Sequence, residues 1–405
     1  MSKRLPLEGI RVLDFTWAWA GPQGTLLLAL LGAEVIKVES RRRLDHARLR
    51  SLVAGPSTTG PDNSFIFNTL NLNKLSVTLN LSKPEAVEIA KSLAKISDVV
   101  TENMRPGVLD RLGLGYEAMK AIKPEIIMLS SSAVGGTGPE RLYTGYAPTF
   151  AALGGLAYIT GRAAGRPAPL MGTIDLRVGS TGAFAVLAAL YHRKRTGKGQ
   201  YIDLSSAEAV SALMGDAFMD YTMNGRVQER MGNRDRVLAP HNCYRCQGEN
   251  QWVTIVAGTE AEWQALCGVI DDSRLTEDER FADTSKRWEN QTALDALIGE
   301  WTAERSPEEV MEALQAVRVA AMPVYDGADL VRDAHVQARG VIEEVEHPAM
   351  GKKKVLGPPW RFSKTPAEIR RPGPLMGQHN DYVLGELLGM SKQEIERLSE
   401  EQVVY

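Results

Sequence analysis

The first half of the chain alternates short apolar runs with helical segments, and this alternation limits the fold more than any other feature. The runs are rich in β-forming residues, and the stretch between the first two predicts a buried helix over residues 24–32. The expected strands are residues 10–15, 33–39, 97–103, 126–133 and 200–206. Strands that are apolar along their length are typical of a parallel sheet with helices on both faces. The sequence therefore predicts an α/β fold.

Capping patterns predict where several helices begin. Ser82 and Glu85 have the spacing of a capping box, which opens a helix that runs to about residue 96. The other helix starts expected from a capping residue are Ser205, Thr259, Ser306 and Ser391. A second buried helix is expected from Ser180 to about residue 195, with Gly197 as its stop.

Composition excludes several classes of function. The chain has 405 residues, a formal net charge of -3 and three cysteines. This charge is too small for nucleic acid or an anionic membrane as the main partner. The apolar runs are too short to cross a bilayer, no secretory signal is recognisable, and the few cysteines suit a reducing cytoplasm. Only His241 lies close to the pair Cys243 and Cys246, so we expect packed thiols and no metal site.

A polar, turn-rich stretch over residues 224–240 predicts a domain boundary. A compact block with its own strand and helices follows it. Short strands and a proline-rich segment then begin at about residue 326. We therefore expect three segments: a large domain over residues 1–225, a small domain over 226–325 and a C-terminal segment over 326–405.

Arginines stand just after two of the expected strands, at the carboxyl ends where open α/β sheets bind ligands. Arg41 and Arg42 follow the strand expected over residues 33–39, and Arg105 and Arg111 follow the strand expected over residues 97–103. Guanidinium groups at these places can bind phosphates in bidentate fashion. The alternative is that they are ordinary solvated surface charges.

The loop after the first expected strand does not have the pattern of a dinucleotide site. It contains Gly21 and Gly24 but no G-x-G-x-x-G, and Trp17 and Trp19 stand where a pyrophosphate turn needs bare backbone. NAD and FAD are therefore not expected. The helix that follows the loop still offers its N-terminus to an anion.

The segment GTIDLRVGSTGAF, residues 172–184, places one carboxylate, Asp175, among small and apolar residues. Most of this segment suits a packed core, so the charge needs an explanation. Asp175 precedes the helix expected from Ser180 and is in position to cap it. The other explanation is that its charge serves in catalysis. The residues alone leave both explanations open.

Seven further features occur in a characteristic order along almost the whole chain. They are the segments LEGIRVLDFTWAWAGPQGTLLLALLGAEVIKVE, NKLSVTLNL, DVVTENMRPGVLDRLGLGY, SSSAVGGTGP, HRKRTGKGQYIDLS, ARGVIEEVEHPAMG and PGPLMGQHNDYVLGELLGMS. Their order and spacing resemble those of the class III CoA-transferases, the family of the formyl-CoA and carnitine CoA-transferases. This resemblance implies a Rossmann-like large domain to which the C-terminal segment returns, a smaller α+β domain, and a dimer of interlocked chains.

The resemblance also implies the site. It makes Asp175 the catalytic nucleophile and places Tyr146 in the lining of the active site. Trp19 stands where relatives that act on very small acids carry glutamine, and an indole there suits a bulky or aromatic acyl group. The implied contacts to CoA are Trp17, Ala18, Arg41, Arg42, Lys74, Asn103, Met104, Arg105, Arg111 and Leu112. Of these, Arg41, Arg42, Lys74 and Arg105 are expected at its phosphates.

The expected function is therefore the transfer of CoA from an acyl-CoA, with succinyl-CoA as donor, to a carboxylic acid, with the bulky, aromatic benzylsuccinate as one candidate acceptor. No permanently bound cofactor is expected, because the CoA thioester is a substrate. An acyl-CoA racemase of the same fold is one alternative, but similar racemases carry a histidine at Tyr146, and tyrosine is a weak base. A silent subunit is another alternative, against which Asp175 argues. The expected partner is a second copy or a paralogous subunit.

Overall fold

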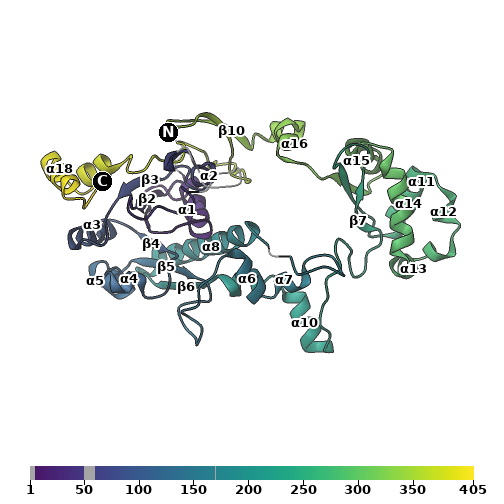
Figure 1. The fold of residues 1–405 in the computed structure, drawn as a ribbon, viewed down its shortest axis with the longest axis horizontal. Coiled ribbons are helices and arrows are strands. Elements are labelled where there is room, and N and C mark those ends of the chain that lie inside the picture. The colour runs from purple at the N-terminus through teal and green to yellow at the C-terminus, as the bar shows by residue number, and fades with distance from the viewer. Residues whose placement is uncertain (1–4, 50–59, 169) are drawn as a thin grey trace. The chain divides into compact units, whose positions relative to one another are not determined.

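The computed structural model describes residues 5–49, 60–168 and 170–405, and it divides into two compact units (Figure 1). The larger unit comprises Met1–Ala157, Pro169–Val227 and Arg339–Tyr405. The smaller unit comprises Tyr158–Ala168 and Gln228–Ala338. Residues 326–338, which we expected in the C-terminal segment, thus belong to the smaller unit.

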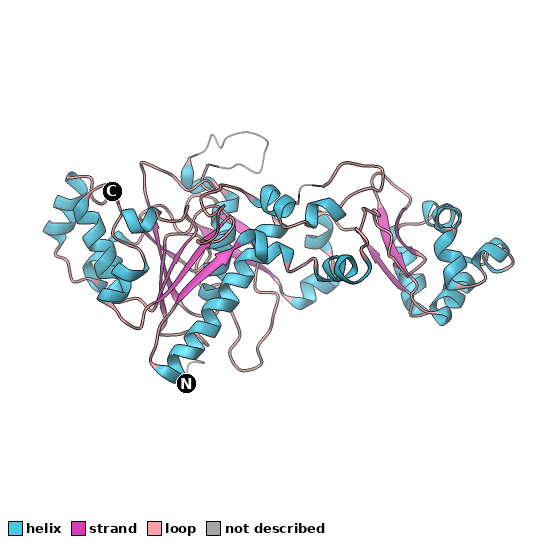
Figure 2. Ribbon diagram, turned by 90° about the horizontal axis from the view of Figure 1, so that it is seen from below, coloured by secondary structure: helices cyan, strands magenta, loops and turns pink. Residues whose placement is uncertain are grey.

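A six-stranded sheet forms the centre of the larger unit. Its strands are β1 (Arg11–Asp14), β2 (Glu34–Glu39), β3 (Leu75–Thr78), β4 (Val99–Glu102), β5 (Ile127–Ser132) and β6 (Tyr201–Ser205). They lie in the order β3-β2-β1-β4-β5-β6, and every neighbouring pair is parallel. Helices cover both faces (Figure 2). The predicted α/β fold with a parallel sheet is confirmed.

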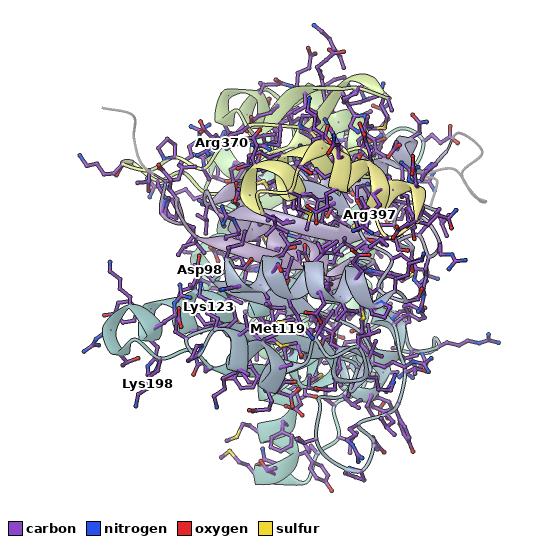
Figure 3. The ribbon with its side chains drawn as sticks, turned by 90° about the vertical axis from the view of Figure 1, so that its left-hand side faces the viewer. Asp98, Met119, Lys123, Lys198, Arg370 and Arg397 are labelled. Carbon is purple, nitrogen blue, oxygen red and sulfur yellow. The ribbon has the colours of Figure 1, made fainter. Side chains whose placement is uncertain are left out.

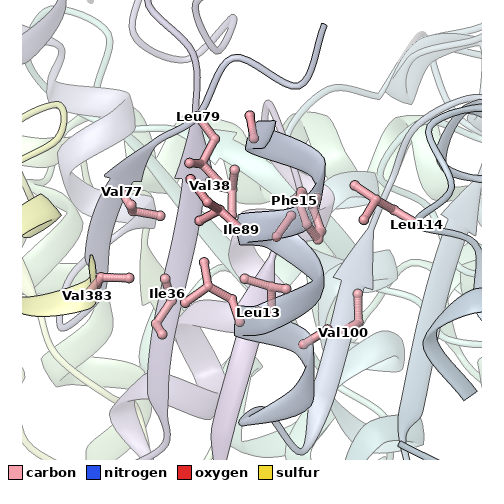
Figure 4. Close-up of a cluster of buried hydrophobic side chains, with 14 of the residues drawn as sticks. Leu13, Phe15, Ile36, Val38, Val77, Leu79, Ile89, Val100, Leu114 and Val383 are labelled. Carbon is pink, nitrogen blue, oxygen red and sulfur yellow. The ribbon is translucent and has the colours of Figure 1, made fainter. Parts of the chain in front are cut away.

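The strands are apolar because both of their faces are buried. On one face, Leu13, Ile36 and Val100 pack against helix α3 (Pro84–Lys95) in a single cluster (Figure 4). Val383 joins the same cluster from the C-terminal segment. On the other face, Val12 and its neighbours pack against helices α1 (Ala20–Leu30) and α8 (Thr173–Thr196). The alternation of apolar strands and helices in the sequence thus has a direct cause in the layers of this unit.

The helices of the larger unit vary widely in length. They are α1 (Ala20–Leu30), α2 (Phe65–Leu70), α3 (Pro84–Lys95), α4 (Val108–Arg111), α5 (Tyr116–Ile122), α6 (Ala147–Leu153), α7 (Leu156–Ile159, which ends in the smaller unit), α8 (Thr173–Thr196), α9 (Ser206–Ser211) and α10 (Gly215–Asn224), with a 3₁₀ turn at Pro61–Asn63. Of the described helices, α8 alone is long and apolar enough to cross a membrane, but here it packs against α1 and the sheet.

Two helix starts differ from the prediction. Lys83, without a side-chain cap, precedes α3, and the Ser82 hydroxyl bonds Asn80 Oδ1 at 2.6 Å instead of capping the helix. Helix α8 begins at Thr173, not near Ser180. By contrast, the predicted caps at the starts of α9 and α18 (Lys392–Glu400) are confirmed. Asn80 thus competes successfully for the Ser82 hydroxyl, a contact that the capping pattern does not show.

The smaller unit packs helices on an antiparallel sheet. Its strands, in the order β7-β8-β9, are β7 (His241–Arg245), β8 (Trp252–Val256) and β9 (Ala320–Pro323). Its helices are α11 (Glu260–Ile270), α12 (Ser273–Thr276), α13 (Thr284–Glu289), α14 (Gln291–Ala303), α15 (Pro307–Ala316), α16 (Gly327–Arg332) and α17 (Ala334–Arg339), with a 3₁₀ turn at Glu279–Phe281. Complete capping boxes open α11 at Thr259 and α15 at Ser306, where capping residues are predicted.

The C-terminal segment closes one edge of the large sheet. It contains the hairpin β10 (Ile342–His347) and β11 (Gly351–Leu356), a π-helix at Asp381–Leu387 and helix α18 (Lys392–Glu400). The Ser76 amide donates to His379 Nδ1 at 3.1 Å, and the Thr78 amide donates to Asn380 Oδ1 at 3.0 Å. On α18, Arg397 (labelled in Figure 3) pairs with Glu85 of α3 at 2.6 Å. The free edge of β3 is therefore partly satisfied by residues some 300 positions away in the chain.

Candidate active site

The candidate site lies where the order of the strands reverses, between β1 and β4. Such a switch point is the usual ligand crevice of an open α/β sheet. Trp17 follows β1 and Asn103 follows β4. The Trp17 amide donates to Asn103 Oδ1 at 2.7 Å, and Asn103 Nδ2 donates to the Trp17 carbonyl at 2.8 Å. Two of the predicted CoA contacts are thus joined directly across the switch point.

Buried charges beneath this loop hold its backbone in place. Ala18 has a φ of 64°, which is unfavourable for a residue other than glycine, and its amide donates to Asp45 Oδ1 at 2.9 Å. Asp45 pairs with Lys37 at 3.1 Å, and Lys37 Nζ donates to the Thr16 carbonyl at 2.7 Å. Burial opposes the charge of Lys37, but Asp45 and other carboxylates outweigh it and raise the pKa of Lys37. The loop that precedes α1 is therefore rigid.

Lys74 is the predicted phosphate contact that the structure places elsewhere. Its side chain is fully buried. Its Nζ donates to the Pro22 carbonyl at 2.9 Å, to Thr25 Oγ1 at 2.7 Å and to Asn71 Oδ1 at 2.9 Å, and it lies 3.4 Å from Asp14 Oδ2. Burial lowers the pKa of Lys74 to about 7, against the pull of Asp14. With its donors used inside the protein, Lys74 supports α1 and is not available to a phosphate.

The predicted arginines lie beside the switch point, three of them on loops and Arg111 at the end of α4. Arg41 and Arg42 follow β2 and are exposed, as are Arg105 and Arg111 after β4. The first of these loops is tethered by Tyr405, whose Oη lies 2.9 Å from Ser40 Oγ and 3.4 Å from the Arg42 amide. These four cations remain accessible to an anion.

Met104 and Leu112 pack their side chains against the core, as parts of the loop and helix after β4. The Met104 amide donates to Glu102 Oε2 at 2.7 Å. Burial raises the pKa of Glu102 to about 7, although hydrogen bonds from Ser130 and Met104 lower it. The sequence did not indicate Glu102, because its raised pKa results from burial at the end of β4.

Asp175 lies in the first turn of α8, three residues after Gly172, the N-cap, whose φ is 64°. Its side chain is half-buried. The expectation that the helix starts near Ser180 is wrong, because Gly179 already lies inside α8, where it contacts α1. A Cβ at Gly179 would lie 2.6 Å from the Ala20 carbonyl oxygen of α1, so glycine permits the two helices to touch. Asp175 is therefore a first-turn residue rather than a cap that precedes the helix.

Three helices bring Asp175, Trp19 and Tyr146 into one neighbourhood. Their neighbours in the chain pack in one cluster: Ala20 follows Trp19, Ala147 follows Tyr146, and Ile174 precedes Asp175. Trp19 is the N-cap of α1, and its indole lies against the start of α8, since a Cβ at Gly172 would meet Trp19 Cζ3 at 3.1 Å. Tyr146 is the N-cap of α6 and is exposed.

His46 and Arg43 join the same group, and no motif in the sequence marked them. The His46 ring centroid lies 6.3 Å from that of Trp17 and 6.3 Å from that of Tyr146. The Arg43 guanidinium lies 5.1 Å from the centre of the Trp17 ring. Both residues stand in the basic segment after β2, so a signal was present only as general positive charge.

Comparisons with known proteins identify the family of the chain. The sequence model of CoA-transferase family III matches residues 7–380. The β subunit of succinyl-CoA–L-malate CoA-transferase from Chloroflexus aurantiacus is 34% identical, over 99% of this chain and 98% of that protein. Succinyl-CoA:glutarate CoA-transferase from Mus musculus is 33% identical, over 97% of this chain and 89% of that protein.

Solved structures give the same result. The crystal structure of a CaiB/BaiF family protein from Brucella suis matches with a TM-score of 0.85 and 30% identity, over 95% of this chain and 100% of that one. The family match and the relatives together cover both units. The chain therefore belongs to CoA-transferase family III and is a class III CoA-transferase.

Proposed function

We propose that the enzyme transfers CoA from succinyl-CoA to a second carboxylic acid, with Asp175 as its nucleophile. The observation that carries this proposal is the place of Asp175, half-buried in the first turn of α8 where Trp19 meets that helix. Two relatives named above use succinyl-CoA, which supports it as the donor.

In the first half of the reaction, a carboxylate oxygen of Asp175 attacks the thioester carbon of succinyl-CoA. The carbon–sulfur bond breaks, which leaves a mixed anhydride on Asp175 and a free CoA thiolate. The thiolate then attacks the aspartyl carbon of the anhydride, and succinate leaves as a carboxylate. Asp175 is now a CoA thioester, and each covalent stage is easier than a direct exchange.

The second half runs in reverse with the acceptor. The acceptor carboxylate attacks the aspartyl thioester and releases the CoA thiolate, which gives a second anhydride. The thiolate attacks the acceptor's carbonyl carbon, so that acceptor-CoA leaves and the Asp175 carboxylate is restored. No proton has to be added or removed in either half, so these steps require no general base.

The surroundings of Asp175 suit these steps. Helix α8 has 24 residues, and the positive pole at its N-terminus favours a carboxylate in the first turn. Amides of that turn point toward the N-terminus and can stabilise the oxyanions of the tetrahedral intermediates. The half-buried Trp19 indole beside Gly172 restricts water, which would hydrolyse the anhydride and the thioester.

We propose that CoA approaches across the switch point. Arg41, Arg42, Arg105 and Arg111 are exposed cations for its phosphates. The remaining contacts carried over from the family are Trp17, Ala18, Asn103, Met104 and Leu112. The rigid loop that contains Trp17 and Ala18 would place the thioester toward Asp175.

For the acceptor, the indoles of Trp17 and Trp19 and the ring of Tyr146 favour a bulky acid. Benzylsuccinate, which is aromatic and has two carboxylates, is the acceptor that fits this reasoning best. We also propose a cytoplasmic location, since Cys243, Cys246 and Cys267 form no disulfide.

We further propose that the enzyme works as a dimer, with a second copy or with a paralogous subunit. Helix α8 exposes Phe184 and Tyr191, at 72% and 63%, and α10 exposes Phe218 and Met223, at 67% and 72%. Large apolar side chains that a helix leaves exposed are candidates for burial against a partner chain. Sedimentation velocity of the protein purified alone tests this proposal; a monomer that is fully active contradicts it.

The function is tested by incubating the enzyme with succinyl-CoA and glutarate, malate or benzylsuccinate, and by following the CoA esters by mass spectrometry. Asp175→Asn should lower the rate of exchange by more than about 10³-fold. Asp271→Asn, at an exposed acid after α11 in the smaller unit, is the control and should retain the wild-type rate. Hydroxylamine added during turnover should convert Asp175 to a hydroxamate. Exchange that proceeds without this modification would refute the covalent mechanism.

A further inference from the structure

We infer that His46 recognises the distal carboxylate of the acyl group and so makes dicarboxylic acids the substrate class of this enzyme. The inference rests on the proposed function, because it assumes that succinyl-CoA binds with its thioester near Asp175. The donor then carries a second carboxylate that takes no part in the transfer. A free charge of this kind needs a partner in a site that restricts water.

His46 stands on a turn whose flanks are buried. Asp45 is 4% exposed and Ala47 is 0% exposed, whereas the His46 side chain is exposed. Asp45 Oδ1 accepts from the Ala47 amide at 2.9 Å as well as from the Ala18 amide at 2.9 Å. The turn is thus fixed to the loop before α1, and it presents the imidazole from a rigid base, as a recognition residue requires.

The ring of His46 lies beside two aromatic residues of the proposed site. Its centroid is 6.3 Å from Trp17, with the planes at 72°, and 6.3 Å from Tyr146, with the planes at 44°. Trp17 belongs to the proposed CoA loop, and Tyr146 begins the helix that packs next to the start of α8. His46 therefore connects the CoA side of the site with its acyl side.

Three other cationic side chains around this turn have partners within the protein. Arg48 is buried and pairs with Glu39 at 2.6 Å. Lys37 is buried and pairs with Asp45 at 3.1 Å. Arg43 lies over the Trp17 ring. His46 is the exposed group of the turn that touches both aromatic rings, and this favours it over these neighbours as the partner of an incoming carboxylate.

The chemistry of imidazole suits this task. A carboxylate within about 4–6 Å favours the protonated ring, and both ring nitrogens then donate. The resulting charge-assisted hydrogen bond is stronger than a neutral one. An acyl chain that ends in a methyl group offers no such partner. A site built to bond a polar group discriminates against the analogue that lacks it.

The test compares succinyl-CoA with butyryl-CoA, which has the same chain length but no distal carboxylate. His46→Gln should lower kcat/KM for succinyl-CoA by about 10-fold to 100-fold, the usual value of a hydrogen bond to a charged group. The same variant should change kcat/KM for butyryl-CoA by less than about 2-fold. If butyryl-CoA is not turned over, its inhibition constant as a competitive inhibitor is compared instead. His46→Arg, which keeps a cation, should retain much of the preference.

Two controls separate this role from others. The affinity for free CoA, measured by calorimetry, should be the same in His46→Gln and in the wild type, whereas a residue that binds CoA would weaken it. His335→Gln, at an exposed histidine on α17 in the smaller unit, should behave as the wild type. An equal loss with both thioesters, or no loss with succinyl-CoA, would overturn the inference. If the wild type transfers CoA from neither thioester, it is the proposed function that fails.

Discussion

The close contact between α1 and α8 can be tested by adding a single methyl group. A Cβ at Gly179 would lie 2.6 Å from the Ala20 carbonyl oxygen and 2.9 Å from the Cβ of Gln23. Backbone atoms cannot move aside as a side chain can, so the helices would have to separate. Overpacking of this kind costs about 1–3 kcal/mol, from which alanine recovers about 1 kcal/mol as the better helix former. We therefore expect Gly179→Ala to lose up to about 2 kcal/mol of stability.

Gly182, one turn further along α8, provides the matched control. A Cβ there would meet the Cδ2 methyl of Leu129 at 3.2 Å and that of Leu204 at 3.4 Å. These are the flexible ends of side chains, so the helix preference of alanine should balance the crowding. Gly182→Ala should therefore be as stable as the wild type to within about 0.5 kcal/mol, or slightly more stable.

Both variants should be assayed by urea unfolding and by steady-state kinetics with succinyl-CoA. Separation of the helices in Gly179→Ala moves Asp175 away from Trp19, and a misplacement of about 1 Å can cost about 10²-fold in rate. We expect kcat to fall by at least about 10-fold in Gly179→Ala and to stay unchanged in Gly182→Ala. If the two variants are equally stable and equally active, the helix contact does not position the nucleophile.

Two more predictions follow from groups near the CoA loop. Burial raises the pKa of Glu102 from its ordinary value of 4.5 to about 7, so the folded state binds this proton more tightly than the unfolded state does. Its contribution to stability is therefore greatest at low pH and is lost as pH rises from about 4.5 to about 7. Glu102→Gln abolishes this loss, and at about 1.4 kcal/mol per pKa unit the stability of the variant relative to the wild type should rise by about 3 kcal/mol between pH 4 and pH 8. Urea unfolding at both pH values measures this difference. The control Glu117→Gln, at an exposed glutamate of α5, should show no such rise. A difference between Glu102→Gln and the wild type that is independent of pH contradicts the prediction. Tyr405→Phe removes the hydroxyl that holds Ser40 and Arg42, so the KM for succinyl-CoA should rise by about 2-fold to 5-fold with kcat unchanged. Tyr325→Phe, in the smaller unit, is the control. An unchanged KM in Tyr405→Phe would show that Tyr405 does not support the site.

The large sheet could be predicted from the sequence because burial on both faces leaves a direct record in the strands. Val12, Leu13, Val35 and Ile36 occupy opposite faces of β1 and β2, yet all are fully buried. Caps at Thr259 and Ser306 were predictable for a similar reason, since a capping box depends only on residues three positions apart. Features fixed by local spacing or by layer burial are therefore accessible from sequence.

Features that depend on contacts between distant segments were not accessible. The helix was expected to begin near Ser180, whereas α8 begins at Thr173 and its Gly179 lies against α1. Lys74 appeared to be a phosphate ligand, and only the oxygens of Pro22, Thr25 and Asn71 show that its charge is used internally. His46 was one basic residue among several until Trp17 and Tyr146 were placed beside it. The candidate site was therefore predicted as a set of residues, but not as an arrangement.

The way the C-terminal segment completes the edge of β3 bears on how the protein is made. Most of the smaller unit is one continuous stretch, residues 228–338, which can fold soon after it leaves the ribosome. The larger unit has to wait for His379, Asn380 and Val383 before its outer strand and core are covered. During that interval β3 is an open template for pairing with other chains. Nascent enzyme should consequently depend on chaperones for longer than its two compact units would suggest.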